Sequence, residues 1–324
     1  MTTNASSIFT ENPVKIEKLV LTKLRGFCAG VVRAIDIVEK ALEVCGRPVY
    51  VRHEIIHNRY VVDDLRAKGA VFVEEFKDVP EGVWMIYSAH GVSPQVRDEA
   101  KAKKFKVIDA TCPLVTKVHL EAIQLAKEGY TIILIGHEEH VETIGTMGEA
   151  PDHIRVVGTS AEAETVQVPD PTKVAYLTQT TLSLDDTAEI VQALKKRFPA
   201  LAVPKKSDIC YATQNRQNAV KALVDRIDLL LVIGSKNSSN SNRLVEVARS
   251  HGVAAHLVDE PDEIDPAWLD GVTIVGLTAG ASAPEDLVQA TVQHLLAARG
   301  GTVEPFLLKE ERVEFPLPKE LASA

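Results

Sequence analysis

The sequence predicts an α/β protein of three similar βα lobes, whose small parallel sheets surround a pseudo-threefold axis. Short β-branched runs alternate with helical patterns along most of the 324 residues, which is typical of parallel strands joined by helical crossovers. Three cysteines stand in matching contexts, each after an extended run and before a helical stretch. Polar loops follow the later strands at matching distances from each cysteine. The three cysteines are 84 and 98 residues apart, and a repeat of that length indicates a repeated domain rather than a solenoid.

The composition and the charge narrow the class of protein. Hydrophobic residues make up 45% and charged residues 25% of the chain, which is ordinary for a globular protein. The net charge is −9 and the basic residues are scattered, so no nucleic-acid partner is expected. No apolar run reaches the roughly 18 residues of a membrane span. With no secretory signal and four cysteines, we expect a reducing, cytoplasmic location and cysteines that act as thiols or metal ligands.

The expected elements follow the alternation of patterns along the chain. The β-branched runs predict strands at 48–55, 82–89, 105–110, 130–136, 173–178, 228–234 and 272–278. Amphipathic spacing predicts helices at 31–42, 115–127, 185–197, 216–226, 243–250 and 284–298. Grouped by the repeat, these elements predict a flexible leader at 1–16, lobes at 17–104, 105–203 and 204–299, and a C-terminal tail at 300–324.

The three matching cysteines mark one point where the lobes meet. Cys28 lies in "RGFCAGVVRAI", Cys112 in "DATCPLVTKVH" and Cys210 in "SDICYATQNRQ", with spacings of 84 and 98 residues. Ligands of parallel sheets bind beyond the carboxyl ends of the strands, so three lobes facing inward bring three thiolates together. Cys45, at the end of a helical pattern, has no counterpart in the other repeats and is expected to be structural.

Three thiolates without a CxxC pair favour an iron–sulfur cluster over a structural zinc ribbon. Such clusters usually have four cysteine ligands, so three would leave one iron with an open position, which suits catalysis. Helix N-termini beside the cysteines favour anionic sulfur. A zinc site of three cysteines and one histidine stays an alternative, because histidines lie in the same loops.

The polar loops of the first and third lobes carry hydrogen-bond donors that suit a phosphate. Several of them lie near helix N-termini, which bind phosphate groups, so a diphosphate could be held without a clamp of Lys and Arg. A single histidine in such a loop usually only forms a hydrogen bond with the backbone. The matching positions of these residues in the repeat are what indicate a binding site. The residues are His57 and His90 in the first lobe, and Ser238, Ser239, Asn240 and Ser282 in the third.

The second lobe contributes the loops "GHEEHVET" and "TQTTLSLDD". In the repeat, His140 of the first loop corresponds to His57, and Thr180 of the second loop corresponds to His90. The first loop also offers three acids, among which the residues alone do not decide: Glu138, Glu139 and Glu142.

These motifs together resemble the family of 4-hydroxy-3-methylbut-2-enyl diphosphate reductases, known as IspH or LytB. The resemblance runs in the right order from about Lys18 to Leu321, through "GFCAGVVRAI", "VRHEIIHN", "SAHGVSP", "DATCPLVTKVH", "GHEEHVET", "QTTLSLDD", "SDICYATQNRQ" and "SKNSSNSNRL". It implies the last step of the methylerythritol phosphate route to isoprenoids. In that step, (E)-4-hydroxy-3-methylbut-2-enyl diphosphate is reductively dehydroxylated to isopentenyl diphosphate and dimethylallyl diphosphate.

The resemblance also implies a cofactor and partners. A [4Fe–4S] cluster held by Cys28, Cys112 and Cys210, at the centre of a three-lobed fold, would bind the substrate hydroxyl at its open iron. An external donor such as ferredoxin or flavodoxin would supply the electrons.

Residue roles follow from the same resemblance. Glu142 matches the family's proton donor, which selects it among the three acids; to donate at neutral pH it needs a raised pKa, and burial beside anions raises it. His140 and Thr180 match catalytic residues near the substrate hydroxyl. The residues that match the diphosphate-binding set are His57, His90, Ser238, Ser239, Asn240 and Ser282, and with His140 and Thr180 they make up the expected substrate-binding set.

Two other functions are compatible with three converging cysteines. An enzyme like quinolinate synthase also has three similar lobes and an open iron, but its carboxylate substrates favour more cationic anchors than these loops offer. A non-catalytic metalloprotein, such as a zinc-stabilised scaffold or a redox sensor, would show no turnover. Colour separates the metals, because an iron–sulfur protein is brown and a zinc protein is colourless.

Overall fold

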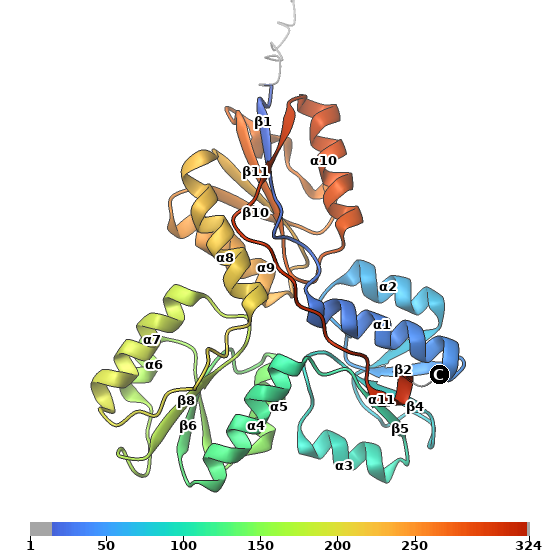
Figure 1. Ribbon diagram of the computed structural model, residues 1–324, viewed down its shortest axis with the longest axis vertical. Helices are drawn as coiled ribbons and strands as arrows, with labels where there is room; N and C mark the ends of the chain where they lie inside the picture. Colours follow the sequence, from blue (N-terminus) through green and yellow to red (C-terminus); the bar gives the residue numbers. More distant parts are fainter. Residues whose placement is uncertain (1–14, 323–324) are drawn as a thin grey trace, which may run out of the picture.

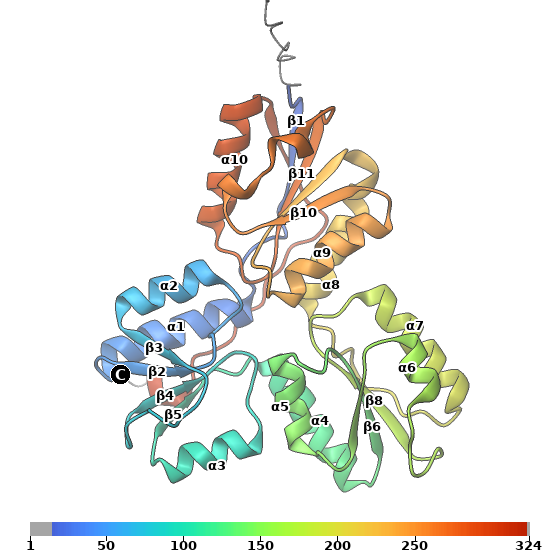
Figure 2. The ribbon, with the colours of Figure 1, turned by 180° about the vertical axis from the view of Figure 1, so that it is seen from behind.

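Three lobes surround a common centre in the computed structural model, which describes residues 15–322 (Figure 1). Each lobe contains one sheet, and every pair of neighbouring strands in the three sheets is parallel. The same arrangement is seen from behind in Figure 2. The predicted α/β class with three small parallel sheets is therefore confirmed. Most of the expected leader, residues 1–14, lies outside the described residues.

The first lobe has a four-stranded sheet in the order β3-β2-β4-β5. Helix α1 lies against this sheet, where Ile37 and Val38 pack with Val51 and Ile86 in one fully buried core. The strands are β2 (Val49–Arg52), β3 (Ala70–Val73), β4 (Trp84–Tyr87) and β5 (Lys106–Asp109), and the helices are α1 (Ala29–Val44), α2 (Arg59–Lys68) and α3 (Pro94–Ala102).

The second lobe has a three-stranded sheet in the order β7-β6-β8. Its central strand, β6, is buried along nearly its whole length, as expected for a strand with helices on both faces. The strands are β6 (Thr131–Ile135), β7 (Ile154–Val157) and β8 (Val174–Thr178), and the helices are α4 (Pro113–Lys127), α5 (Val141–Glu149), α6 (Ser160–Thr165) and α7 (Leu184–Arg197).

The third lobe has a five-stranded sheet in the order β10-β9-β11-β1-β12. Its strands are β1 (Lys18–Thr22), β9 (Leu229–Ile233), β10 (Ala254–Val258), β11 (Ile274–Ala279) and β12 (Thr302–Phe306). Its helices are α8 (Tyr211–Leu223), α9 (Ser239–Ser250) and α10 (Glu285–Arg299), with single 3-10 turns at Val224–Arg226, Pro261–Glu263 and Pro266–Leu269. No described helix is both long and apolar enough to cross a membrane.

The chain passes from one lobe to the next at each of the three cysteines. Strand β1 pairs with β11 of the third lobe, but the helix that follows Cys28 packs in the first lobe. Strand β5 pairs with β4 of the first lobe, but the helix that follows Cys112 packs in the second. Before Cys210, Ala202 bridges to Ala175 of β8, and the following helix packs in the third lobe. Each cysteine therefore lies on a crossover between two lobes.

Two strands consequently lie in a different sheet from the one that the expected lobe limits imply. The limits 17–104 and 105–203 assign β1 to the first lobe and β5 to the second, whereas these strands complete the third and the first sheet. The physical reason is that strand pairing is non-local, and the periodic pattern of the sequence does not say which sheet a strand joins.

The expected tail also has structure, and it connects two lobes. Strand β12 is the edge strand beside β1, and the chain then runs across to the first lobe, where α11 (Lys319–Ala322) lies against α1 (Figure 1). Leu317 and Leu321 pack into the apolar core of that lobe.

Candidate active site

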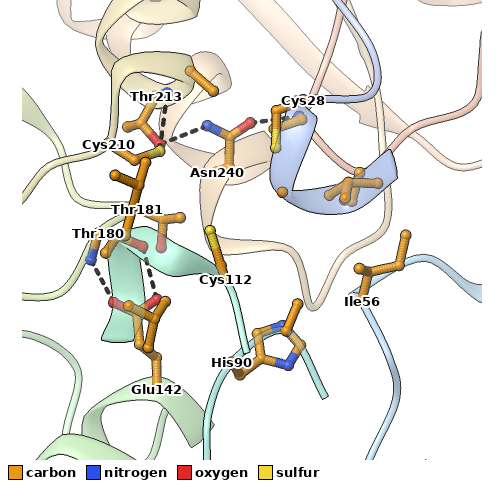
Figure 3. A pocket seen from close by; sticks show the side chains of 18 of the residues that line it. Cys28, Ile56, His90, Cys112, Glu142, Thr180, Thr181, Cys210, Thr213 and Asn240 are labelled. Carbon is orange, nitrogen blue, oxygen red and sulfur yellow. Dashed lines mark hydrogen bonds between the residues drawn. The ribbon is translucent and has the colours of Figure 1, made fainter. Parts of the chain in front are cut away.

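A pocket opens where the three lobes meet, and every lobe contributes side chains to it (Figure 3). All the residues predicted from the sequence as ligands, catalytic groups or substrate contacts line this pocket. They are Cys28, His57, His90, Cys112, His140, Glu142, Thr180, Cys210, Ser238, Ser239, Asn240 and Ser282. The structure thus brings together residues that are spread over more than 250 positions of the chain.

The three cysteines occupy equivalent positions. Each is the N-cap residue of its helix, α1, α4 or α8, so its side chain lies at the positive end of the helix dipole. All are free thiols, and their sulfur atoms point into the space between the lobes (Figure 3). Each backbone N–H donates to a loop carbonyl: Cys28 to Ala281 at 3.1 Å, Cys112 to Ala89 at 2.9 Å and Cys210 to Thr180 at 3.0 Å.

Gly30 leaves room for two of the sulfur atoms. A Cβ at this position would lie 2.8 Å from Sγ of Cys112 and 3.8 Å from Sγ of Cys28, so both sulfurs lie close to one point. Burial raises the pKa of Cys112 to about 12 and that of Cys210 to about 11, because buried thiolates without a cation are unfavourable. A bound cationic metal removes that penalty. The converging thiols and the space above Gly30 therefore fit an iron–sulfur cluster.

Cys45 lies apart from this centre. It is the C-cap residue of α1 and packs at the border of the apolar core of the first lobe. It does not line the pocket.

Glu142 is buried at the pocket and paired with Thr180. The backbone N–H of Thr180 donates to Oε1 at 2.6 Å, and the Thr180 hydroxyl lies 2.8 Å from Oε2 (Figure 3). Burial raises the pKa of Glu142 to about 7, although these hydrogen bonds oppose the rise. Glu138 and Glu139, the other two acids of the loop, are exposed. Only one of the three acids therefore reaches the pocket.

His140 presents a neutral N–H donor to the pocket. It caps α5, where its Nδ1 accepts the backbone N–H of Glu142 at 3.2 Å, so the ring proton lies on Nε2. Burial lowers the pKa of His140 to about 3, which keeps the ring uncharged. The Nε2 atom is buried and has no partner in the protein. An orphaned buried donor at a pocket indicates a missing acceptor.

His57 and His90 form a stacked pair with ring centroids 4.1 Å apart, and the His57 ring lies edge-on to that of His140 at 5.4 Å. Nδ1 of His57 faces Oε2 of Glu54 at 3.4 Å, and Nε2 is buried without a partner. Burial holds the pKa of His90 well below its usual range. Glu54 also accepts a hydrogen bond from Asn237 at 2.9 Å, which links the first lobe to the third.

The polar residues of the third lobe line the same pocket but already have partners. Asn240 has a partner at each end of its amide: its Oδ1 accepts the N–H of Ala281 at 2.8 Å, and its Nδ2 donates one hydrogen to Thr213 at 3.2 Å. Ser238 caps α9, and Ser282 donates to the His57 carbonyl at 3.0 Å. These residues hold the wall in shape, and the histidines carry the unpartnered atoms.

Several residues of the site were not predicted from the sequence. Glu54 lies in the quoted motif "VRHEIIHN", where its carboxylate was not singled out. Thr213 donates to Sγ of Cys210 from its backbone N–H at 3.4 Å, a contact that its position three residues after the cysteine could have suggested. Phe315, from the C-terminal tail, also lines the pocket, and no local pattern indicates that.

Comparison with known proteins decides the family. The model of the LytB protein family matches residues 19–296. The chain belongs to the LytB family. A 4-hydroxy-3-methylbut-2-enyl diphosphate reductase of Azoarcus sp. is 57% identical over 307 residues, which cover 95% of this chain and 98% of the relative. The reductase of the same name from Mycolicibacterium paratuberculosis is 55% identical and covers 99% of this chain and 96% of its own length.

A solved LytB structure agrees with the fold. The E-1-hydroxy-2-methyl-but-2-enyl-4-diphosphate reductase of Plasmodium falciparum superimposes with a TM-score of 0.92 at 44% identity, covering 96% of this chain and 98% of that one. Family membership and full-length relatives named as reductases make this LytB chain an enzyme of the oxidoreductase class.

Proposed function

We propose that this LytB chain reductively dehydroxylates (E)-4-hydroxy-3-methylbut-2-enyl diphosphate to isopentenyl and dimethylallyl diphosphates, the last step of the methylerythritol phosphate pathway. The observation that carries the proposal is one pocket that holds three free thiols, a buried acid with a raised pKa and histidines with unpartnered ring nitrogens. The relatives that cover the whole chain are named for this reaction.

Cys28, Cys112 and Cys210 would hold a [4Fe–4S] cluster with one open iron. When bound, the cluster supplies electrons one at a time and a Lewis-acidic iron. The protein positions the three sulfurs from three lobes, with Gly30 leaving space between two of them. Because Cys112 and Cys210 are buried, their thiolates are more stable with a cationic group bound to them than without one.

The histidines bind the diphosphate in this proposal. Nε2 of His57 is buried without a partner, and an anionic oxygen of the diphosphate forms a hydrogen bond with it. Glu54 lies 3.4 Å from Nδ1 of His57, so it orients the ring with Nε2 towards the anion. The other residues of the predicted substrate-binding set also line the pocket: His90, Thr180, Ser238, Ser239, Asn240 and Ser282.

Glu142 delivers the proton to the departing hydroxyl. A carboxyl group with a pKa of about 7 is protonated in half of the molecules at neutral pH, which is the range of an effective general acid. The Thr180 hydroxyl lies beside Oε2, where it orients the acid and can share the proton. His140 stays neutral, and its unpartnered Nε2–H donates to the substrate hydroxyl.

The electrons come from an external donor such as ferredoxin or flavodoxin. The four free cysteines suit the reducing cytoplasm, where the enzyme would act.

The test is anaerobic reconstitution followed by turnover with the allylic diphosphate and a chemical reductant. Brown protein with iron and sulfide, together with the formation of both isomeric diphosphates, is the expected result. Colourless protein that binds zinc in place of iron, or iron–sulfur protein without turnover, would contradict the proposal.

A further inference from the structure

The helix that follows each cysteine carries one basic residue that reaches the loop before the next cysteine. Arg33 lies five residues after Cys28 on α1. Its Nη1 donates to the carbonyl groups of Ala110 and Thr111, at 3.3 and 3.1 Å, directly before Cys112. This contact joins the helix of one cysteine to the loop of the next.

Lys117 repeats the arrangement on α4, five residues after the cysteine that caps this helix. Its Nζ donates to the Lys206 carbonyl at 3.0 Å and to Oδ1 of Asp208 at 2.6 Å. The Asp208 side chain is fully buried, and its other oxygen accepts the N–H of the last residue of β8 at 3.0 Å. These bonds fix the segment that leads into Cys210.

Arg216 closes the cycle from α8, six residues after Cys210. Its side chain is 1% exposed, and its Nη2 donates to the Gly26 carbonyl at 2.7 Å, two residues before Cys28. Its Nη1 also contacts Glu311 of the C-terminal tail at 3.2 Å. The tail therefore helps to hold this side chain in place.

The three contacts share their position, their direction and their target. Each starts on the second turn of the helix after one cysteine and ends within four residues before the next cysteine. Other basic residues on the same helices do not do this: Lys40 pairs with its neighbour Glu43 on α1, and Lys127 is exposed at the end of α4. A need for packing alone would not repeat the same contact in the same sense three times.

We propose that Arg33, Lys117 and Arg216 are positioning residues that hold the three cysteine loops in register for one metal cluster. The inference rests on the proposed iron–sulfur cluster. Each cysteine lies on a crossover between lobes, so its sulfur keeps its place only if both flanking lobes are tied together. Partners outside the ligand sphere orient metal ligands, and charge and hydrogen bonding near an iron–sulfur cluster alter its electronic properties.

The experiment compares reconstituted holoenzymes of five variants with the wild type, the fifth being the conservative Lys117→Arg. Arg33→Met and Lys117→Met remove the contacts, and Lys40→Met and Lys127→Met are matched controls on the same two helices. The readouts are the rate of iron loss to a chelator and the electron paramagnetic resonance spectrum of the reduced cluster. Thermal unfolding of the metal-free proteins measures the fold separately.

Loss of iron about 10–100-fold faster in Arg33→Met and Lys117→Met than in the controls, with an altered spectrum, is the expected result. Lys117→Arg, which keeps the charge and the donor, restores slow iron loss. Lys117→Met removes the cation beside the buried carboxylate of Asp208, and this variant could fail to fold for that reason. In that case Arg33→Met tests the proposal, because Arg33 donates to backbone carbonyl groups and its removal leaves no buried charge without a partner.

Two negative results are distinguishable. Wild-type protein that binds no iron overturns the proposed function and this inference with it. Wild-type protein that holds iron, with variants that lose iron at the control rate and show the control spectrum, overturns this inference alone.

Discussion

Thr180 contacts both carboxylate oxygens of Glu142, one through its backbone N–H at 2.6 Å and one through its hydroxyl at 2.8 Å. The carbonyl of the same residue accepts the N–H of Cys210 at 3.0 Å. One residue of the second lobe therefore fixes the position of the buried acid relative to one thiol. In the proposed function, this residue links the proton donor to one ligand of the cluster.

Glu142→Gln is expected to lose about 10²–10⁴-fold in turnover, because the amide cannot donate the proton but fills the same space. The variant keeps its iron and its substrate affinity. Anaerobic single-turnover kinetics at matched iron content measure the effect. Glu138→Gln and Glu139→Gln are the controls, since both acids are exposed in the same loop. Turnover within a few-fold of the wild type would move the role to His140 or to a water bound by Thr180.

Thr180→Val is expected to move the pH profile of turnover to higher pH. Burial raises the pKa of Glu142 to about 7, and the hydrogen bonds from Thr180 hold it below the value that burial alone would give. Removal of the hydroxyl raises this pKa further, so the acid form persists to higher pH. The pH dependence of single-turnover rates checks the direction. A profile that shifts to lower pH, or does not move, contradicts the assignment.

Gly30→Ala is expected to lower the affinity for iron without harming the fold. The added Cβ would lie 2.8 Å from Sγ of Cys112, so the sulfur must move. Alanine favours a helix over glycine by about 1 kcal/mol, so the metal-free protein should unfold at the same temperature or higher. Iron content after reconstitution and thermal unfolding separate the two effects.

Cysteine variants complete this comparison. Cys112→Ser should remove most of the iron, and Cys45→Ser should leave it, because Cys45 lies outside the pocket. Equal iron loss in both would show that the ligand set is wrong.

Glu54→Gln is expected to weaken the binding of pyrophosphate about tenfold or more, because a charge-assisted hydrogen bond contributes roughly 1.5–3 kcal/mol. The carboxylate faces Nδ1 of His57 at 3.4 Å and orients that ring. Glu74→Gln is a matched control, since Glu74 pairs with Nδ1 of His53, which does not line the pocket. Isothermal titration with pyrophosphate measures both. Equal affinity in the two variants would exclude Glu54 from anion binding.

Protonation of Glu149 is expected to make the free energy of unfolding of the metal-free protein fall at low pH. Burial raises the pKa of Glu149, but hydrogen bonds from His119 and Arg97 outweigh this and bring it to about 2. Because the folded value lies below the ordinary 4.5, the stabilisation is complete above pH 4.5 and is lost as the pH falls towards 2. The loss is on the order of 3 kcal/mol.

Urea unfolding between these pH values measures this loss. Glu149→Gln should be less stable than the wild type at neutral pH and should depend less on pH in that range. A wild-type stability that does not change between pH 4.5 and 2 would contradict the pairing as a source of stability.

The sequence alone predicts the lobes and the convergence of the cysteines, because both depend on a local pattern that repeats three times. Element ends are less predictable. The helices that begin at Tyr211 and Ser239 start several residues before the apolar spacing, because caps at Cys210 and Ser238 nucleate polar first turns. The expected helix ranges omit α2, α3, α5 and α6, and α5 begins at Val141 in a motif that looks like a polar loop.

The site shows the same division. Cys28 and His57 are predictable because they hold matching positions in the repeat, whereas Glu142 is selected among three acids only by the resemblance to a family. Phe315 and Glu54 are not, because their role depends on contacts with other lobes that no local spacing reveals. The same is true of the partner of β1, which lies more than 250 residues away in the chain.

Because the chain crosses between lobes near the cysteines, the repeat in the sequence and the lobe in the structure have different limits. The strand before Cys28 and the strand before Cys112 each belong to the sheet of the neighbouring lobe. A single repeat, begun before its cysteine, could not use its own first strand, because β1 and β5 complete the sheet of the unit before them. A segment cut out at the limits 17–104 or 105–203 would therefore lose a strand of its own sheet or carry one whose partner stays behind, and the open sheet edge would be free to pair with other chains. The lobes consequently cannot be separated at these limits without breaking a sheet.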